Sequence, residues 1–456
     1  MMSKPSIPKG TRDFGPAEMI RRNYIFSTIR KAFETFGFMP IETPAMENLS
    51  TLTGKYGEEG DQLIFKILNN GDFLAKADAQ AMQEGDSKKL AFSISKKALR
   101  YDLTVPFARF VVMNQTELTF PFRRYQIQPV WRGDRPGKGR YQEFYQCDAD
   151  IVGTEGLTCE VELVQLFDEV LTNLQIPGFE IRINNRKILL ALAQVAGIED
   201  RLVDLTVAMD KLDKIGENGV VDELQKRGIP EGAIEKIRPL FSLNGDFQTK
   251  HNVLSAIFEG NEAGQKGLEE LRYVFDAIRQ MELRSGKLEF DVTLARGLNY
   301  YTGAIFEVVV PGVQIGSICG GGRYDDLTGI FGLPNVSGVG ISFGADRIYD
   351  VLHELNLFPN ASATVSQLLF VNFGEAEERY CLNLATRLRR QGVACELYPT
   401  SAKMKKQMTY ANNLGFPYVA LVGSREMETG IITIKKMETG EQYAVDKSEI
   451  LEFLTA

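Results

Sequence analysis

The sequence predicts an α+β protein with three parts: a core built on an antiparallel sheet flanked by helices, a helical insertion in that core, and a C-terminal α/β domain with a mainly parallel sheet. Short β-rich runs separated by turns dominate the first third of the chain, and helical pieces broken by glycine and proline fill residues 195–285. Strands and helices alternate after residue 366. At 456 residues the chain is also too long for one compact core, so we expect several domains.

The first expected elements are a helix and a strand. Residues 17–36 repeat apolar positions every three and four residues, which predicts an amphipathic helix ending at Gly37. Residues 38–44 then favour an extended strand bounded by Pro44. The elements expected next are an antiparallel sheet to about residue 153, a helix over 157–174 and a strand over 179–183.

The helical block interrupts the first domain rather than ending it. Strand and turn patterns resume at residues 288–292 and continue to about Gly344. We therefore expect a discontinuous core made of residues 1–194 and 286–355, with the helical insertion at 195–285 between its halves.

The last part of the chain follows a linker. Residues 356–366 are small and polar and include a proline, which is typical of an interdomain segment. From 367 to 456, strand and helix patterns alternate at short spacing, as in a parallel βαβ sheet.

The charge balance limits the possible partners. The chain has 52 basic and 60 acidic residues, a net charge of −8, so any nucleic-acid contact must come from local basic patches. The first ten residues lack the apolar core of a signal peptide, and no apolar run approaches the ~20 residues of a membrane span. We expect a soluble, cytoplasmic protein with no membrane partner.

Cysteine and histidine are too sparse for several kinds of site. The five cysteines are widely spaced and form no CxxC pair, which argues against a disulfide framework or a thiolate zinc site. Only His251 and His353 are present, and neither lies near a candidate nucleophile in the sequence. No fixed protein metal site is expected, so arginines, carboxylates, tyrosines or a bound metal must carry the chemistry.

Two glycine-rich segments resemble nucleotide motifs but fit none of them. Residues 320–325 (GGGRYD) lack the Lys-Ser/Thr of a Walker A loop, and residues 338–344 (GVGISFG) lack the βαβ context of a dinucleotide site. Glycine content alone favours close-packed strands or a hairpin turn. Asp346 and Arg347 follow directly, where an arginine at a strand-to-helix corner could reach a phosphate.

Residues 122–144 predict a strand, a basic loop and a second strand. A solvated surface would explain the basic charges. However, strand alternation places Val130 and Arg132 on one face, and an arginine that shares a face with an apolar residue needs an anion from the protein or from a ligand.

Two shorter segments also carry polar side chains between strand-like flanks. Residues 98–106 (ALRYDLTVP) are interpreted as a strand with Asp102 and Thr104 on one face. Residues 294–303 (LARGLNYYTG) combine an arginine with two tyrosines, and a β-turn with core tyrosines would explain them equally.

Taken together, these segments resemble the class II aminoacyl-tRNA synthetases, and in particular the histidyl-tRNA synthetases. Residues 37–44, 132–144 and 338–347 match the three class II motifs, and the histidine-specific pair is 296–301 (RGLNYY) with 320–325. The resemblance covers nearly the whole chain and implies a class II synthetase-like catalytic core, an anticodon-binding domain at 367–456 and a homodimer.

The resemblance also implies roles for particular residues. The reaction would join L-histidine to tRNA(His) with ATP and Mg²⁺, where the metal accompanies the substrate. The catalytic residues implied are Arg132, Arg296 and Arg347. Those implied for ATP are Arg132, Asp134, Phe144 and Arg347. Those implied for histidine are Asp102, Leu103, Thr104, Arg132, Gln146, Asp150, Arg296, Tyr300 and Tyr301.

Two alternatives remain open on the residues alone. A regulatory paralogue would bind histidine without charging tRNA, but such proteins typically lose ATP-binding arginines and the anticodon-binding module, whereas this chain has Arg132, Arg347 and a C-terminal domain. A sibling synthetase for threonine, proline or glycine would share the C-terminal module but not the histidine-specific pair.

Overall fold

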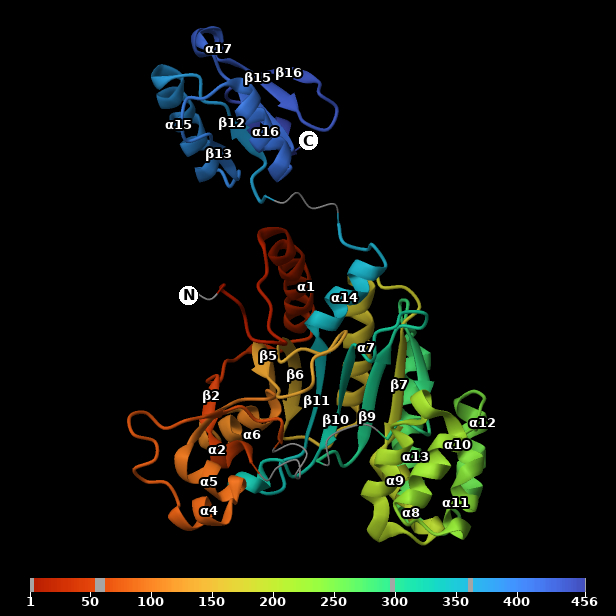
Figure 1. Ribbon diagram of the computed structural model, residues 1–456. Coiled ribbons are helices and arrows are strands. Elements are labelled where there is room, and N and C mark those ends of the chain that lie inside the picture. The colour runs from red at the N-terminus through yellow and green to blue at the C-terminus, as the bar shows by residue number, and fades with distance from the viewer. Residues whose placement is uncertain (1–3, 54–61, 296–299, 360–363, 456) are drawn as a thin grey trace. The chain divides into compact units, whose positions relative to one another are not determined.

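The computed structural model describes residues 4–53, 62–295, 300–359 and 364–455. The chain forms two compact units. The first consists of residues 1–12 and 25–357, and the second of residues 13–24 and 358–456. Each unit has its own sheet, and each is described separately below (Figure 1).

An eight-stranded sheet forms the centre of the first unit (Figure 1). In sheet order its strands are β1 (Met39–Pro40), β5 (Phe122–Trp131), β6 (Glu143–Val152), β11 (Gly338–Gly344), β10 (Cys319–Tyr324), β9 (Ala304–Val309), β7 (Glu180–Asn185) and β8 (Lys287–Phe290). The two edge strands pair in parallel and all inner pairs are antiparallel. The predicted antiparallel core, including the strand–loop–strand of residues 122–144, is therefore confirmed.

One face of this sheet is covered by helices. They are the part of α1 (Pro16–Thr35) from Ile25 onward, α7 (Thr158–Asn173) and α14 (Ala345–Glu354), and α1 ends before Gly37 as predicted. The ring of Phe343 on β11 lies 5.8 Å from that of Phe33 on α1 and 5.4 Å from that of Phe167 on α7. These three rings are fully buried, so an apolar core fills the space between this face of the sheet and the helices.

Both glycine-rich segments are strands, which is one of the two structures that their glycine content favoured, and the two strands pair with each other. Gly321 on β10 pairs with Ile341 on β11, and a Cβ atom at Gly321 would lie 2.2 Å from the carbonyl oxygen of Gly340. No side chain fits at that distance, which explains the glycine. The backbones of β10 and β11 therefore approach each other here with no side chain between them.

A smaller sheet with four helices lies at one end of the first unit (Figure 1). Its elements are β2 (Met46–Asn48), β4 (Lys97–Leu99), β3 (Lys66–Ile67), α2 (Leu49–Leu52), α4 (Ala79–Glu84), α5 (Ser87–Ile94) and α6 (Thr104–Met113). The predicted strand over residues 98–106 is wrong: β4 stops at Leu99 and Thr104 begins α6. Pro106 fits there because the first turn of a helix needs no amide donor.

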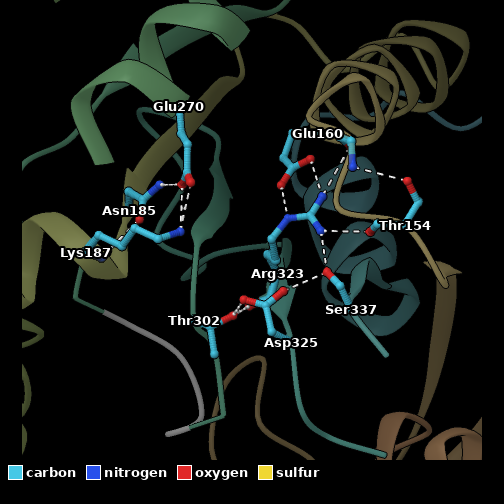
Figure 2. A network of polar contacts seen from close by, with 10 residues as sticks. Thr154, Glu160, Asn185, Lys187, Glu270, Thr302, Arg323, Asp325 and Ser337 are labelled. Atoms are coloured by element: carbon cyan, nitrogen blue, oxygen red, sulfur yellow. Dashed lines mark hydrogen bonds and ion pairs between the residues drawn. The ribbon is translucent and has the colours of Figure 1, made fainter. Parts of the chain in front are cut away.

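A block of helices occupies the other end of the sheet, beside β7 (Figure 1). Its elements are α8 (Arg186–Ala196), η1 (Glu199–Arg201), α9 (Leu202–Met209), α10 (Leu212–Lys226), α11 (Glu231–Ile237), η2 (Arg238–Leu240), α12 (Phe247–Ile257) and α13 (Glu262–Met281). The first helix begins at Arg186, so the boundary predicted at residue 195 falls inside α8. Lys187 and Asn185 at its start both contact the carboxylate of Glu270 on α13, at 2.9 and 2.7 Å (Figure 2).

The second unit contains a five-stranded sheet in the order β13-β12-β14-β15-β16. Its elements are β12 (Leu368–Phe370), α15 (Glu375–Arg390), β13 (Cys395–Leu397), α16 (Met404–Leu414), β14 (Tyr418–Leu421), α17 (Ser424–Thr429), β15 (Ile431–Lys436), β16 (Gln442–Asp446) and α18 (Ile450–Thr455). The strands β13, β12 and β14 are parallel, as the βαβ pattern predicted, and β15 and β16 extend them antiparallel.

All five cysteines are buried free thiols. Among the helices that the structure describes, none is long and apolar enough to cross a membrane.

Candidate functional site

A cavity of about 340 Å³ opens on the face of the large sheet opposite α1, α7 and α14. It is lined by ten of the predicted site residues, namely Asp102, Thr104, Arg132, Asp134, Phe144, Gln146, Asp150, Tyr300, Tyr301 and Arg347. The side chain of Leu103 is fully buried and is not among the lining residues. Arg296 lies outside the described residues. Segments far apart in the chain thus meet in one site.

Strand β6 supplies a row of polar side chains to this cavity. Gln146, Asp148 and Asp150 alternate along the strand with Cys147, Ala149 and Ile151, which are fully buried. Because successive side chains of a strand point to opposite faces, one strand serves both the core and the cavity.

Asp150 is held by two neighbours. Its carboxylate forms an ion pair with Arg124 at 2.7 Å and accepts a hydrogen bond from the Tyr324 hydroxyl at 2.6 Å. Arg124 is 0% exposed, lies directly opposite Asp150 on β5 and packs its guanidinium over the Phe107 ring at 4.2 Å. Burial raises the pKa of Asp150, and Arg124 opposes that effect. A Cβ atom at Gly340 would lie 1.9 Å from this carboxylate, so the glycine leaves the space that Asp150 fills.

Asp148 is the next carboxylate along the row. It is 2% exposed, and burial raises its pKa to about 7, although Arg124 opposes the change. Ser342 on β11 lies opposite Asp148 and hydrogen-bonds to its side chain. The Ser342 hydroxyl also accepts a hydrogen bond from Nε2 of Gln146 at 3.1 Å, which links the two polar residues of β6.

Asp102 and Thr104 reach the cavity from the start of α6. The Asp102 carboxylate accepts a hydrogen bond from the backbone amide of Val105 at 3.3 Å. Burial raises the pKa of Asp102 to about 6, while Arg132 favours its charged form. The correct local structure is thus a turn into a helix, and it still brings both polar side chains to the cavity.

The two tyrosines pack against each other on the cavity wall. Their ring centroids are 4.6 Å apart, and the Tyr300 hydroxyl lies 3.5 Å from the Tyr301 hydroxyl. Burial raises the pKa of both phenols, so both remain neutral hydroxyls near pH 7. A neutral hydroxyl can donate as well as accept, which suits it to a ligand nitrogen.

Arginines line the cavity from the loop after β5 and from the start of α14. Arg132 donates from Nε to the Tyr101 carbonyl at 2.8 Å, and its guanidinium lies 5.2 Å from the centroid of the Phe144 ring. Arg347 donates to the carbonyl oxygens of Gly139 and Ser317, at 3.0 and 2.5 Å. Both side chains are therefore fixed by backbone oxygens, and Arg347 stands at the predicted strand-to-helix corner.

A polar network behind the tyrosines anchors the segment that carries them. Figure 2 shows Arg323 of β10 facing Glu160 of α7, with Nε–Oε1 and Nη2–Oε2 distances of 2.5 and 2.7 Å. Arg323 also donates to Ser337 at 2.7 Å. Further contacts join Ser337 and Thr302 to Asp325, and the Thr302 amide to the Arg323 carbonyl. Since Thr302 directly follows Tyr301, the network fixes the position of the tyrosines.

The site also contains residues whose roles the sequence did not predict, namely Arg124, Asp148, Tyr324 and Arg323. Their roles depend on which residues face each other across the strands, such as Arg124 opposite Asp150. Alternation along a strand predicts the face of a side chain but not its partner. The Asp-x-Asp spacing of residues 148 and 150 was the one available signal, because it places both carboxylates on the same face.

An antiparallel sheet with helices on one face and an arginine-lined pocket on the other is typical of class II aminoacyl-tRNA synthetases. The family model described as histidyl-tRNA synthetase matches residues 73–348, and the model described as anticodon binding domain matches residues 367–456. The chain belongs to the histidyl-tRNA synthetase family.

Relatives and solved structures agree along the full length. A histidine–tRNA ligase of Christiangramia forsetii is 60% identical over 98% of both chains, and one of Phocaeicola vulgatus is 55% identical over 100% of both. The crystal structure of histidyl-tRNA synthetase from Nostoc sp. PCC 7120 has a TM-score of 0.84 at 30% identity and covers 100% of this chain and 99% of that one.

Proposed function

We propose that the protein is a histidine–tRNA ligase, which activates L-histidine with ATP to histidyl-adenylate and pyrophosphate and then transfers histidine to the 3′ end of tRNA(His). The observation that carries this proposal is the cavity itself, in which buried carboxylates face tyrosine hydroxyls beside two anchored arginines. The family membership of the whole chain supports the same activity.

The arginines serve adenylate formation. This step needs no enzyme nucleophile, because the carboxylate of the amino acid attacks the α-phosphorus of ATP, so the protein positions the reactants and neutralises charge. Arg132 holds the α-phosphate and the substrate carboxylate, and Arg347 holds the γ-phosphate. Phe144 stacks on adenine, and Asp134 contributes to the ATP site. Arg296 stands beside the α-phosphate, and Mg²⁺ arrives with ATP.

The polar end of the cavity selects the amino acid. Asp102, Thr104 and Gln146 bind the α-ammonium group, with Leu103 beside them, while Asp150, Tyr300 and Tyr301 surround the imidazole. A neutral imidazole has one donor and one acceptor, which a carboxylate and a hydroxyl satisfy together. An analogue that leaves these buried groups without hydrogen-bond partners should react less efficiently than histidine, often by a factor of ~10⁴.

The C-terminal unit serves the second half-reaction. Residues 367–456 bind the anticodon of tRNA(His), and the protein acts in the cytoplasm. A homodimer forms through α1 and the strand bounded by Pro44, as in the class II resemblance. Analytical ultracentrifugation tests the dimer, and a monomer at all concentrations would exclude it.

The decisive experiment is amino-acid-dependent ATP–pyrophosphate exchange with each of the twenty amino acids. Histidine alone should stimulate the exchange. Stimulation by threonine, proline or glycine without histidine identifies a sibling synthetase, and histidine binding without exchange identifies a regulatory paralogue.

Truncation near Ala361 separates the two half-reactions. Every described residue assigned to ATP and histidine precedes this point, so adenylate formation should persist at least in part. Charging of tRNA should fall steeply, because the anticodon contacts are lost. Full tRNA charging by the truncated chain would show that residues 367–456 do not bind the anticodon.

A further inference from the structure

Two buried acceptor atoms on the same strand line the cavity. Neither Oε1 of Gln146 nor Oδ1 of Asp148 has a hydrogen-bond partner among the described residues, and each atom is buried within the protein. Both residues belong to the cavity-facing row of β6. Because an unpaired buried acceptor is costly, two of them in a ligand cavity indicate that the ligand supplies the donors.

The geometry around these atoms fixes their orientation. Nε2 of Gln146 donates to the Ser342 hydroxyl, which also hydrogen-bonds to the Asp148 side chain. Gln146 therefore directs its amide nitrogen to Ser342, and Oε1 is left as the acceptor. The nearest cation on the adjacent strand, Arg124, forms its ion pair with Asp150.

We propose that Asp148 is a further specificity-determining residue, which binds the α-ammonium group of the substrate together with Gln146 and Asp102. The inference rests on the proposed function, since it names a contact of the histidine substrate. An ammonium group has three hydrogen-bond donors and no acceptor, and its positive charge is complementary to the negative carboxylates of the cavity wall. Asp148 lies between Gln146 and Asp150 along β6, where it can reach the α-position of a histidine whose ring lies against Asp150.

The protonation of Asp148 should change when the ammonium group binds, and this change gives a measurable sign of the contact. The groups that face it are Arg124 on β5, Asp150 on β6, Ser342 on β11, Asp102 before α6, and more distantly Tyr301 and Arg100. With a pKa of about 7, the carboxyl is partly protonated at neutral pH. A bound ammonium group favours the carboxylate, so histidine binding should release protons near pH 7 and should tighten as the pH rises through 7.

Two ligands that differ only at the α-position test the contact. Imidazolepropionate keeps the ring and the carboxylate of histidine but has hydrogen in place of the ammonium group. In calorimetric titrations, Asp148→Asn should weaken histidine binding roughly tenfold or more, because a charge-assisted hydrogen bond is lost. The affinity for imidazolepropionate should change by less than about twofold, which is within the usual effect of a remote substitution.

Asp168→Asn is the matched control. Asp168 is also a buried aspartate, but it lies on α7 and accepts hydrogen bonds from the amides of Ser285 and Gly286, at 3.2 and 2.7 Å, away from the cavity. It should leave both affinities unchanged. Equal losses for both ligands in Asp148→Asn, or no loss for either, would overturn the inference.

A measurement on the wild type covers the case in which Asp148→Asn does not fold. Titrations at pH 7 in buffers of different ionisation enthalpy give the number of protons released. Each ligand's own imidazole also loses protons when it binds as a neutral ring, so that number, known from titration of the free ligand, is subtracted. Histidine should then show a remaining release of protons and imidazolepropionate should show none, and equal remainders contradict the inference. Failure of the proposed function would look different, because the wild type would then show no histidine-dependent exchange at all.

Discussion

The two ends of the cavity hold their charged groups in different ways. At the carboxylate end, Asp148 and Asp150 sit on a central strand, and Arg124, the partner of Asp150, is fully buried on the next strand. At the arginine end, Arg132 and Arg347 are half-buried and come from a loop and a helix start, each fixed by backbone carbonyl oxygens. The charged side chains of the carboxylate end are therefore part of the buried core. Those of the arginine end are only half-buried and come from segments outside the strands.

This difference predicts how the two ends respond to substitution. Changes that break or displace an ion pair at the carboxylate end, or in the Arg323 network behind it, should reduce stability together with histidine recognition. Changes at the arginine end should reduce catalysis while the fold remains intact.

Arg323→Met should lower the free energy of unfolding of the first unit by about 3–5 kcal/mol, because it leaves Glu160 buried without its cation. The Michaelis constant for histidine should also rise, since Tyr301 loses its anchor. Trp131, the single tryptophan, lies at the end of β5 and reports urea unfolding of this unit by fluorescence. Arg279→Met is the control, because its ion pair with Asp276 is exposed and worth at most about 1 kcal/mol. Equal effects of both substitutions would contradict the contrast.

Arg132→Ala and Arg347→Ala should each reduce ATP–pyrophosphate exchange about a hundredfold, or about 3 kcal/mol of transition-state stabilisation. Each removes a charge-assisted phosphate contact, while the unfolding curve should stay close to that of the wild type. Wild-type exchange in either folded variant would mean that the phosphates bind elsewhere.

Gly340→Ala should cost about 1–3 kcal/mol of stability and raise the Michaelis constant for histidine more than that for ATP. The new methyl group would collide with the Asp150 carboxylate, which must then move from its place beside Tyr324. Gly232→Ala is the control, because a Cβ atom there meets nothing within 4 Å. A variant with unchanged histidine affinity would show that Asp150 does not contact the ring.

The pH dependence of stability should reveal the buried carboxyl of Asp148. Its folded-state pKa of about 7 lies above the ordinary value of 3.8, so the folded state binds the proton more tightly and this group costs stability as the pH rises from about 4 to 7. Asp148→Asn removes that cost. Relative to the wild type it should gain stability from pH 5 to 7, by at most about 1.4 kcal/mol per pH unit. A constant difference across this range would contradict the raised pKa.

The sequence was most informative where a pattern is local. The pair β5–β6, the strands β10 and β11, the helix α7 and the βαβ part of the second unit all follow from alternation, helical periodicity or glycine content. Asp102 and Thr104 were assigned to the right site on the wrong element, because a strand, a turn and a helix start follow one another within eight residues. Such short elements give no period to recognise.

Contacts between side chains on neighbouring strands could not be predicted from the sequence. The partner of Asp150 is Arg124, 26 positions earlier, and it became recognisable only once the register of β5 against β6 was known. Residues 186–194 were assigned to the core because the predicted helical block began at a change of pattern, whereas α8 starts immediately after β7. A strand that passes directly into a helix leaves no turn residue to mark the boundary.

The pairing of Arg124 with Asp150 across β5 and β6 also has a consequence for folding. A slip of one residue between two strands turns every side chain of the slipped strand to the other face, so a misregistered β6 would direct Cys147 and Ala149 into the cavity. Such a sheet could bury apolar groups but could not bind the amino acid. Histidine therefore stabilises only the chains whose strands paired correctly, and the substrate itself distinguishes native from misassembled molecules during synthesis.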